Sequence, residues 1–155
     1  MAKEQTKGGG RGGQSIRDVM TPNPVCVSEK DTVQEVARIM AREDTGVVPV
    51  VDGKRVVGLI TDRDIVVRLI AEGKDVANAR VNEAMTKSVR SVKEDARVDE
   101  VLSLMSNAQV RRVPVVNASD ELVGIVSLGD LATETNRDGK VGQAVEDISQ
   151  GPANN

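Results

Sequence analysis

The sequence contains no aromatic residue and no histidine, and it has a single cysteine, Cys26. Without Phe, Tyr or Trp, the core must be aliphatic, and single-stranded nucleic acid cannot be bound by stacking bases on aromatic rings. Without histidine, the commonest general base and metal ligand are missing. One cysteine can form neither an intrachain disulfide nor a cysteine metal cluster. These absences argue against an enzyme, a resident metal and a nucleic-acid partner.

Cys26 lies between Val25 and Val27 in a short strand-like run, which favours a small residue in a sheet over a reactive thiol. The formal net charge of -3 gives no general basic field for DNA. No apolar run has the length of a membrane span or a signal-peptide core. We therefore expect a cytoplasmic protein with no membrane partner.

The chain contains one pattern twice. Each copy begins with Met-Thr, continues through a Val-Pro-Val-Val run and a Val-Gly-aliphatic run, and ends with Ser/Thr-x-x-Asp. The matching residues are 20–21 with 85–86, 48–51 with 113–116, and 57–64 with 123–130. The offset changes from 65 to 66 where the turn at residues 53–55 becomes residues 118–121. An insertion confined to a turn is expected for two copies of one folded unit.

Composition divides the chain into five segments. Residues 1–14 are Gly-rich and predict a disordered tail, and residues 73–80 form a polar linker between repeats at 15–72 and 81–135. Residues 136–155 form a polar tail. Within that tail, one helical face is formed by Val141, Ala144, Val145 and Ile148. It predicts a short docked helix, with a fluctuating tail of chance spacing as the alternative.

Each repeat is predicted to fold as strand, helix, strand, strand, helix. Thr32 and Glu35 form a capping-box pattern at a helix start; in the second copy Arg97 replaces Thr32, and Asp95 is the substitute cap. One face of each helix is predicted to be buried: Val33, Val36, Ala37 and Met40 in the first copy, and Val98, Val101, Leu102 and Met105 in the second.

A β-hairpin is predicted from strands at residues 47–51 and 56–60. Thr61 then opens a helix whose apolar residues are Ile65, Val66, Leu69 and Ile70, and the counterpart at Ser127 carries Leu131 and Ala132. Gly58 and Gly124 are expected to let strand and helix pack closely.

The most informative local pattern is Thr61-x-x-Asp64 and its echo Ser127-x-x-Asp130. Two interpretations stay open. In the first, each pair is a capping box, with the hydroxyl and the carboxylate bonded to backbone N–H groups of their own helix start. In the second, the helix start faces a phosphate, and the carboxylate accepts hydrogen bonds from two vicinal hydroxyls such as those of a ribose.

The order of these motifs resembles the cystathionine-β-synthase (CBS) domain, here as a tandem pair over roughly residues 15–135. The resemblance implies an α+β fold, a pseudo-twofold pair of β-α-β-β-α units (a Bateman-type module). Many relatives bind adenosine-containing ligands in the cleft between the repeats. It further implies that Thr61 and Ser127 contact phosphate and that Asp64 and Asp130 hold ribose hydroxyls. The strand backbone that would read adenine is Val47, Val48 and Pro49 in the first copy, with Val113 and Pro114 in the second.

The two copies differ around these positions. Arg111 and Arg112 stand where the first copy has Gly46 and Val47. Strand neighbours point to opposite faces, so at most one guanidinium enters the site, where it could clamp a phosphate; the alternative is that both are solvated or paired. We therefore expect two unequal sites.

The resemblance predicts a regulatory adenine-nucleotide sensor that acts on a separate, unidentified partner chain and requires no cofactor. AMP or ATP is the first choice of ligand, followed by NAD or S-adenosylmethionine. A homodimer is expected, packed through apolar stripes in residues 65–70 and 98–105. The alternative is a nucleotide-independent dimeric interaction module, and an enzyme is the weakest hypothesis.

Overall fold

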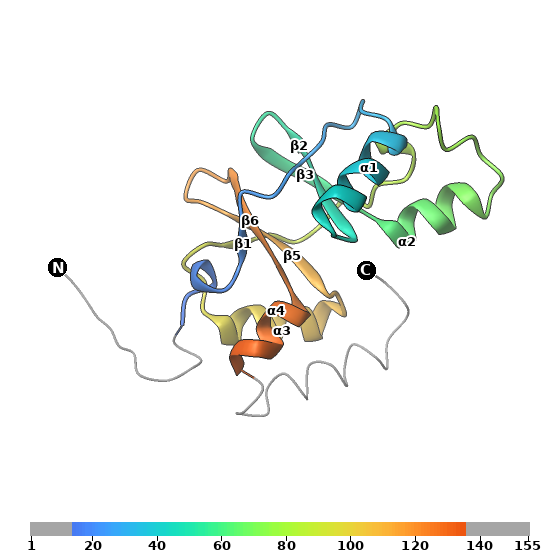
Figure 1. Ribbon diagram of the computed structural model, residues 1–155. Helices are drawn as coiled ribbons and strands as arrows, with labels where there is room; N and C mark the ends of the chain where they lie inside the picture. The colour runs from blue at the N-terminus through green and yellow to red at the C-terminus, as the bar shows by residue number, and fades with distance from the viewer. Residues whose placement is uncertain (1–13, 136–155) are drawn as a thin grey trace. The chain divides into compact units, whose positions relative to one another are not determined.

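The computed structural model describes residues 14–135, which form two compact units (Figure 1). The first unit comprises Asn23–Arg90 and Asp120–Leu122. Within the described part, the second unit comprises residues 14–22, 91–119 and 123–135. The predicted tail over residues 1–13 and the predicted helix over residues 141–148 lie outside the described residues.

Both units contain a helix, a β-hairpin and a second helix in the predicted order. The first unit has α1 (Val33–Glu43), β2 (Val47–Asp52), β3 (Arg55–Thr61), α2 (Asp62–Ile65), the π-helical segment η3 (Val66–Ile70) and the 3-10 turn η4 (Val81–Glu83). The second has the 3-10 turn η2 (Ile16–Asp18), β1 (Thr21–Pro22), β4 (Val92–Lys93), α3 (Val98–Ala108), β5 (Arg112–Val116), β6 (Leu122–Ser127) and α4 (Leu128–Thr135). The predicted α+β class, in two copies, is confirmed.

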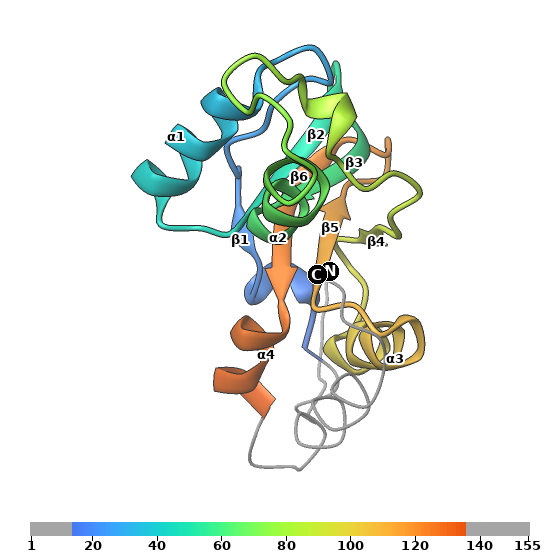
Figure 2. The ribbon, with the colours of Figure 1, turned by 90° about the vertical axis from the view of Figure 1, so that its right-hand side faces the viewer.

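The strands follow one plan in both units. In the second unit the order is β1-β6-β5-β4, with β1 antiparallel to β6 and β4 parallel to β5. In the first unit the β2–β3 hairpin lies in the middle, Thr86 pairs antiparallel with Leu59, and Val27 pairs parallel with Val50. Figure 2 shows β5 and β6 running together in the second unit, with α3 and α4 at their lower end.

Each unit is completed by a Met-Thr segment that begins the other repeat. Thr86 belongs to the second repeat, yet its N–H donates to the Leu59 carbonyl at 2.8 Å and its own carbonyl accepts from Leu59 N–H at 3.0 Å. Likewise Thr21, from the first repeat, pairs with Ile125 of β6. The repeats of the sequence and the compact units of the structure therefore do not coincide.

Gly58 and Gly124 make room for these crossing segments. A Cβ on Gly58 would meet Met85 Cε and, at 2.5 Å, the carbonyl oxygen of Thr86. A Cβ on Gly124 would meet the Met20 side chain and, at 3.0 Å, the Thr21 carbonyl oxygen. The prediction that these glycines let strand pack on helix was wrong, because their close neighbour is the Met-Thr segment that pairs with the hairpin.

Helix α1 begins at the predicted cap, where the Thr32 hydroxyl accepts from the Glu35 N–H at 3.2 Å. The buried face differs from the prediction, since Ala37 is exposed and Ile39 takes its place. Isoleucine has more apolar area than alanine, so this rotation of the helix removes more of that area from water. The residues that face the core are Val33, Val36 and Ile39, with Met40 partly buried.

Helix α3 begins differently from α1. Its cap position is Arg97, whose backbone N–H donates to Glu100 Oε1 at 2.8 Å. Asp95, the predicted substitute cap, is exposed and lies before the cap position. The predicted buried face is confirmed in full: Val98, Val101, Leu102 and Met105. Because these four side chains lie in the core, they cannot form the apolar stripe predicted for a partner.

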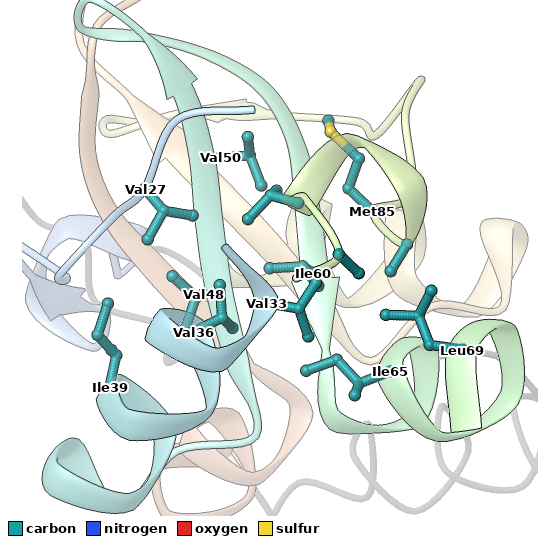
Figure 3. Close-up of a cluster of buried hydrophobic side chains, with 13 residues drawn as sticks. Val27, Val33, Val36, Ile39, Val48, Val50, Ile60, Ile65, Leu69 and Met85 are labelled. Atoms are coloured by element: carbon teal, nitrogen blue, oxygen red, sulfur yellow. The ribbon is translucent and has the colours of Figure 1, made fainter. Parts of the chain in front are cut away.

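Figure 3 shows the aliphatic core of the first unit. Side chains from α1, both hairpin strands and the helix after Thr61 converge there, and Met85 joins them from the crossing segment. Ile65 and Leu69 point into this cluster (Figure 3). Val66 and Ile70, in the run predicted to present an apolar stripe to a partner, are 51% and 55% exposed. A single helix presents only one side to the hairpin, so the apolar residues on its other side remain in water.

Candidate ligand-binding sites

In the first unit, Thr61 and Asp64 form a complete capping box at the start of α2. The Asp64 N–H donates to Thr61 Oγ1 at 3.0 Å, and the Thr61 N–H donates to Asp64 Oδ2 at 3.0 Å. Thr61 is only 1% exposed. The bonds required by the capping interpretation are therefore present, and they engage one of the two carboxylate oxygens of Asp64.

The second carboxylate oxygen of Asp64 meets two groups that the sequence did not reveal. Thr86 Oγ1 lies 3.3 Å from Asp64 Oδ1, and Arg68 Nε lies 3.7 Å from the same oxygen. Arg68 is one turn further along the helix, so an acid followed four residues later by a cation was the available signal. Thr86 could not be found in this way, because 22 residues separate it from Asp64.

The predicted adenine-reading strand lies directly beside this helix start. Val47 is paired with Thr61 across the hairpin, and the Asp62 N–H donates to the Gly46 carbonyl at 3.0 Å. Two backbone groups of Val47 are already engaged, because its N–H and carbonyl both bond to the Thr45 hydroxyl, at 3.3 and 3.2 Å.

The other strand residues of this first site are also inside the fold. Val48 is buried, and Pro49 is buried with its carbonyl accepting from the Val27 N–H at 3.0 Å. The structure thus brings the predicted strand and helix-start residues together, with several of their backbone groups already bonded within the fold.

The second unit repeats the capping box. The Asp130 N–H donates to Ser127 Oγ at 3.1 Å, and the Ser127 N–H donates to Asp130 Oδ2 at 2.9 Å. The Leu128 N–H donates to the Arg111 carbonyl at 2.8 Å, which places the start of α4 beside the residue that precedes β5. This contact corresponds to the one between Asp62 and Gly46 in the first unit.

Arg111 and Arg112 lie next to this second helix start. Arg111 is exposed, Arg112 is half-buried, and Val113 and Pro114 follow as buried residues of β5. Within residues 14–135 neither guanidinium is hydrogen-bonded or ion-paired. Pairing of either arginine with an acid is therefore absent from the described part of the chain, and the phosphate clamp and solvated side chains stay as the alternatives.

Cys26 is exposed, and the protein around its thiol still removes part of its hydration. This desolvation raises the pKa of the Cys26 thiol. Because the thiolate is the reactive form, a raised pKa makes the group less reactive at neutral pH. The prediction that Cys26 is a small residue of a sheet was wrong, because Cys26 is exposed and lies outside the strands.

Comparison with known families identifies the architecture. The family model of the CBS domain matches residues 16–71 and residues 81–136. The chain therefore belongs to the CBS domain family and carries two CBS domains in tandem.

Several of the similar proteins have about the same extent as this chain. The uncharacterized protein YlbB of Bacillus subtilis is 44% identical over 138 residues, which cover 88% of this chain and 92% of that protein. A crystal structure of Hypoxic Response Protein I with two coordinated zinc ions has a TM-score of 0.70 at 37% identity, covering 77% of this chain and 98% of that one. The CBS-domain pair of protein MJ0100, crystallised with 5′-methylthioadenosine and S-adenosyl-L-methionine, has a TM-score of 0.70 at 30% identity, with the same coverage.

Two further findings concern the described part of the chain. No helix within residues 14–135 is long and apolar enough to cross a membrane. In the same residues, no group of three or more His, Cys, Asp or Glu side chains is placed to hold a metal ion.

Proposed function

We propose that this CBS-domain pair is a regulatory protein that binds an adenosyl ligand and transmits binding to a separate partner protein. The observation that supports it is the repeated placement of a Ser/Thr-x-x-Asp helix start beside the Val-Pro strand. One backbone bond fixes this placement in each unit, between Asp62 and Gly46 and between Leu128 and Arg111. The MJ0100 pair, 30% identical, was crystallised with two adenosyl compounds, which supports the same ligand class here.

Each proposed site divides the ligand among three groups of residues. The backbone of the strand, Val47 to Pro49 or Val113 to Pro114, reads the adenine edge. The carboxylate of Asp64 or Asp130 accepts the ribose hydroxyls. Thr61 or Ser127, at the helix start, lies toward the phosphate.

The second site is better suited to a phosphate than the first. Arg111 or Arg112 can clamp a phosphate with two parallel N–H···O bonds, whereas the first site has Gly46 and Val47 at these positions. The adjacent Gly129 carries no side chain to hinder the ligand, and a Cβ there would meet nothing closer than Ser127 Oγ at 3.7 Å. AMP and ATP are therefore the first ligands to test, followed by NAD and S-adenosylmethionine.

Thermal unfolding in the presence of each compound tests the proposal. A ligand at one hundred times its Kd adds about 2.7 kcal/mol to the free energy of unfolding, a melting shift of about 5–10 °C for a chain of this size. Asp64→Ala and Asp130→Ala should each reduce the shift, and the double variant should abolish it. A shift that survives in the double variant would show that these carboxylates do not hold the ligand.

Glu100→Ala is the matched control for those variants. Glu100 accepts the N–H of the cap residue Arg97 at 2.8 Å, as Asp130 accepts that of Ser127 at 2.9 Å. Its removal costs about 1 kcal/mol of helix-end stabilisation without touching either proposed site. The apo melting temperature should fall as in the aspartate variants, while the ligand-induced shift remains.

A homodimeric, nucleotide-independent interaction module is the second candidate. The observation that favours it is the exposed apolar group on η3, where Val66, Val67 and Ile70 are 51%, 46% and 55% exposed. Burying such residues against a second copy would remove apolar surface from water. Light scattering should give twice the 16.5 kDa chain mass, and Ile70→Glu should give the monomer. A monomeric mass for the unaltered protein at micromolar concentration excludes the dimer.

A further inference from the structure

Arg68 holds together three groups at the first site. Its Nη1 donates to the Met85 carbonyl at 2.9 Å, its Nη2 donates to Thr86 Oγ1 at 3.5 Å, and its Nε lies 3.7 Å from Asp64 Oδ1. The Thr86 hydroxyl lies within 3.4 Å of both carboxylate oxygens of Asp64. The Asp64 side chain is 13% exposed, and that of Arg68 is 48% exposed. Asp64 is therefore surrounded by donors from its own unit.

Donors of the fold take up about half of the acceptor positions of Asp64, and Arg68 lies beside one of the rest. A carboxylate offers about four acceptor positions on its two oxygens. The Thr61 N–H and the Thr86 hydroxyl each take up one position on Asp64. The Arg68 cation forms an ion pair with Asp64 Oδ1. Two vicinal hydroxyls would need both positions that remain, one on each oxygen, so one of them must share Oδ1 with the Arg68 cation 3.7 Å away.

The second repeat lacks a cation at the position of Arg68. Asp64 corresponds to Asp130 at an offset of 66, so Arg68 corresponds to position 134, which is Glu. Thr86 corresponds to Thr21, and this hydroxyl is retained. At this helix position the first repeat thus has a guanidinium and the second has a carboxyl group, although both repeats carry the same Ser/Thr-x-x-Asp motif.

We propose that Arg68 is a specificity-determining residue that competes with the ligand ribose for Asp64 and weakens the first site. This inference rests on the proposed function. Ligand affinity falls in proportion to the fraction of molecules in which Asp64 is available. A partly exposed ion pair contributes about 0.2–1 kcal/mol, which corresponds to a roughly 1.4- to 5-fold weaker affinity.

The test isolates the first site by removing the second with Asp130→Ala. Isothermal titration with adenosine, which carries no charge, compares this variant with Asp130→Ala/Arg68→Gln. Glutamine keeps an N–H donor for the Met85 carbonyl but has no charge. The inference expects about 2- to 5-fold tighter adenosine binding in the double variant.

Salt provides a readout that a purely structural Arg68 would not change. Raising NaCl from about 50 to about 500 mM screens the partly exposed pair and should tighten adenosine binding in Asp130→Ala. In Asp130→Ala/Arg68→Gln the salt effect should be absent. Arg38→Gln is the matched control in the Asp130→Ala background. It removes a guanidinium that pairs with Glu35 at 3.9 Å on α1 of the same unit, and it should leave adenosine affinity and its salt dependence unchanged.

Each remaining outcome has a definite meaning. Unchanged or weaker binding in the Arg68→Gln variant, or an effect no larger than that of Arg38→Gln, overturns the inference. If Arg68→Gln does not fold, Thr86→Val removes the other side-chain donor and should tighten the first site by a smaller factor; no change there also overturns it. If no adenosyl compound binds the unaltered protein or any variant, the proposed function fails together with the inference. If adenosine binds but Arg68→Gln does not tighten it, only the inference about Arg68 fails.

Discussion

The two units share their backbone bonds and differ in the side chains at their candidate sites. The Val81 N–H donates to the Asp31 carbonyl at 2.8 Å in the first unit, and the Ile16 N–H donates to the Ala96 carbonyl at 2.7 Å in the second. The two bonds are equivalent, because Val81 lies 65 positions after Ile16 and Ala96 lies 65 positions after Asp31. Backbone bonding thus keeps both units on one plan, and side chains are where the two sites can diverge.

The divergence falls on charged residues around a common frame. The first site has Arg68 beside Asp64, whereas the second has Arg111 and Arg112 beside its helix start. Under the proposed function, a cation beside the acid would oppose ribose binding, whereas a cation beside the helix start would favour a phosphate. The comparison teaches that one motif can stand among different charged neighbours in the two units, and the predictions below probe how far the equivalence of the units extends.

The largest difference is expected at the matching methionines of α1 and α3. Met105 is fully buried and Met40 is only partly buried. Met105→Ala should lower the free energy of unfolding by about 2–5 kcal/mol, and Met40→Ala by roughly half as much, because Met40 already contacts water. Urea unfolding measures both values. Equal losses would mean that the two cores are packed alike at this position.

A smaller difference is expected at the glycines that admit the crossing segments. Gly58→Ala should cost about 1–3 kcal/mol, since its Cβ would press on the backbone oxygen of Thr86. Gly124→Ala should cost less, because its closest neighbour is the flexible side chain of Met20. The control is Gly129→Ala, which meets no close atom and should be neutral or stabilise α4 by up to about 1 kcal/mol. Thermal unfolding that ranks Gly124→Ala as the costlier change contradicts this account.

The smallest difference is expected at the helix caps. Thr32→Ala removes the hydroxyl that accepts the Glu35 N–H and should cost about 1 kcal/mol. Arg97→Ala should change stability by less than about 0.5 kcal/mol, since the bond at that cap uses the Arg97 backbone N–H and the Glu100 side chain. Urea midpoints report both effects, and a comparable loss at Arg97 would show that its side chain supports the helix start.

Much of the local structure followed from the sequence. The hairpin of β2 and β3 was predicted from β-branched runs around Gly53, and the α1 start from Thr32, because turns and caps depend on neighbouring residues. Thr61 and Asp64 were predicted as a capping pair, and both bonds are present. The repeat itself indicated the family, since an order of motifs is written along the chain.

Errors arose where a long-range neighbour decided the outcome. Ala37 and Ile39 both suited the periodicity of α1, and only packing against the hairpin selected Ile39. The apolar stripe predicted for a partner over residues 98–105 was wrong for the same reason, because periodicity does not state whether the protein's own core covers that face.

The sequence alone determined that this protein is a duplicated aliphatic α+β unit with a Ser/Thr-x-x-Asp motif in each copy. These properties depend on residue type and on spacings of a few residues, which set hydrogen bonds and periodicity locally. Only the tertiary structure decided that Thr86 pairs with Leu59, that Gly58 accommodates Met85, and that Thr86 reaches Asp64. Those contacts join segments from different repeats, and their geometry comes from closing the chain around a shared core, which no local pattern encodes.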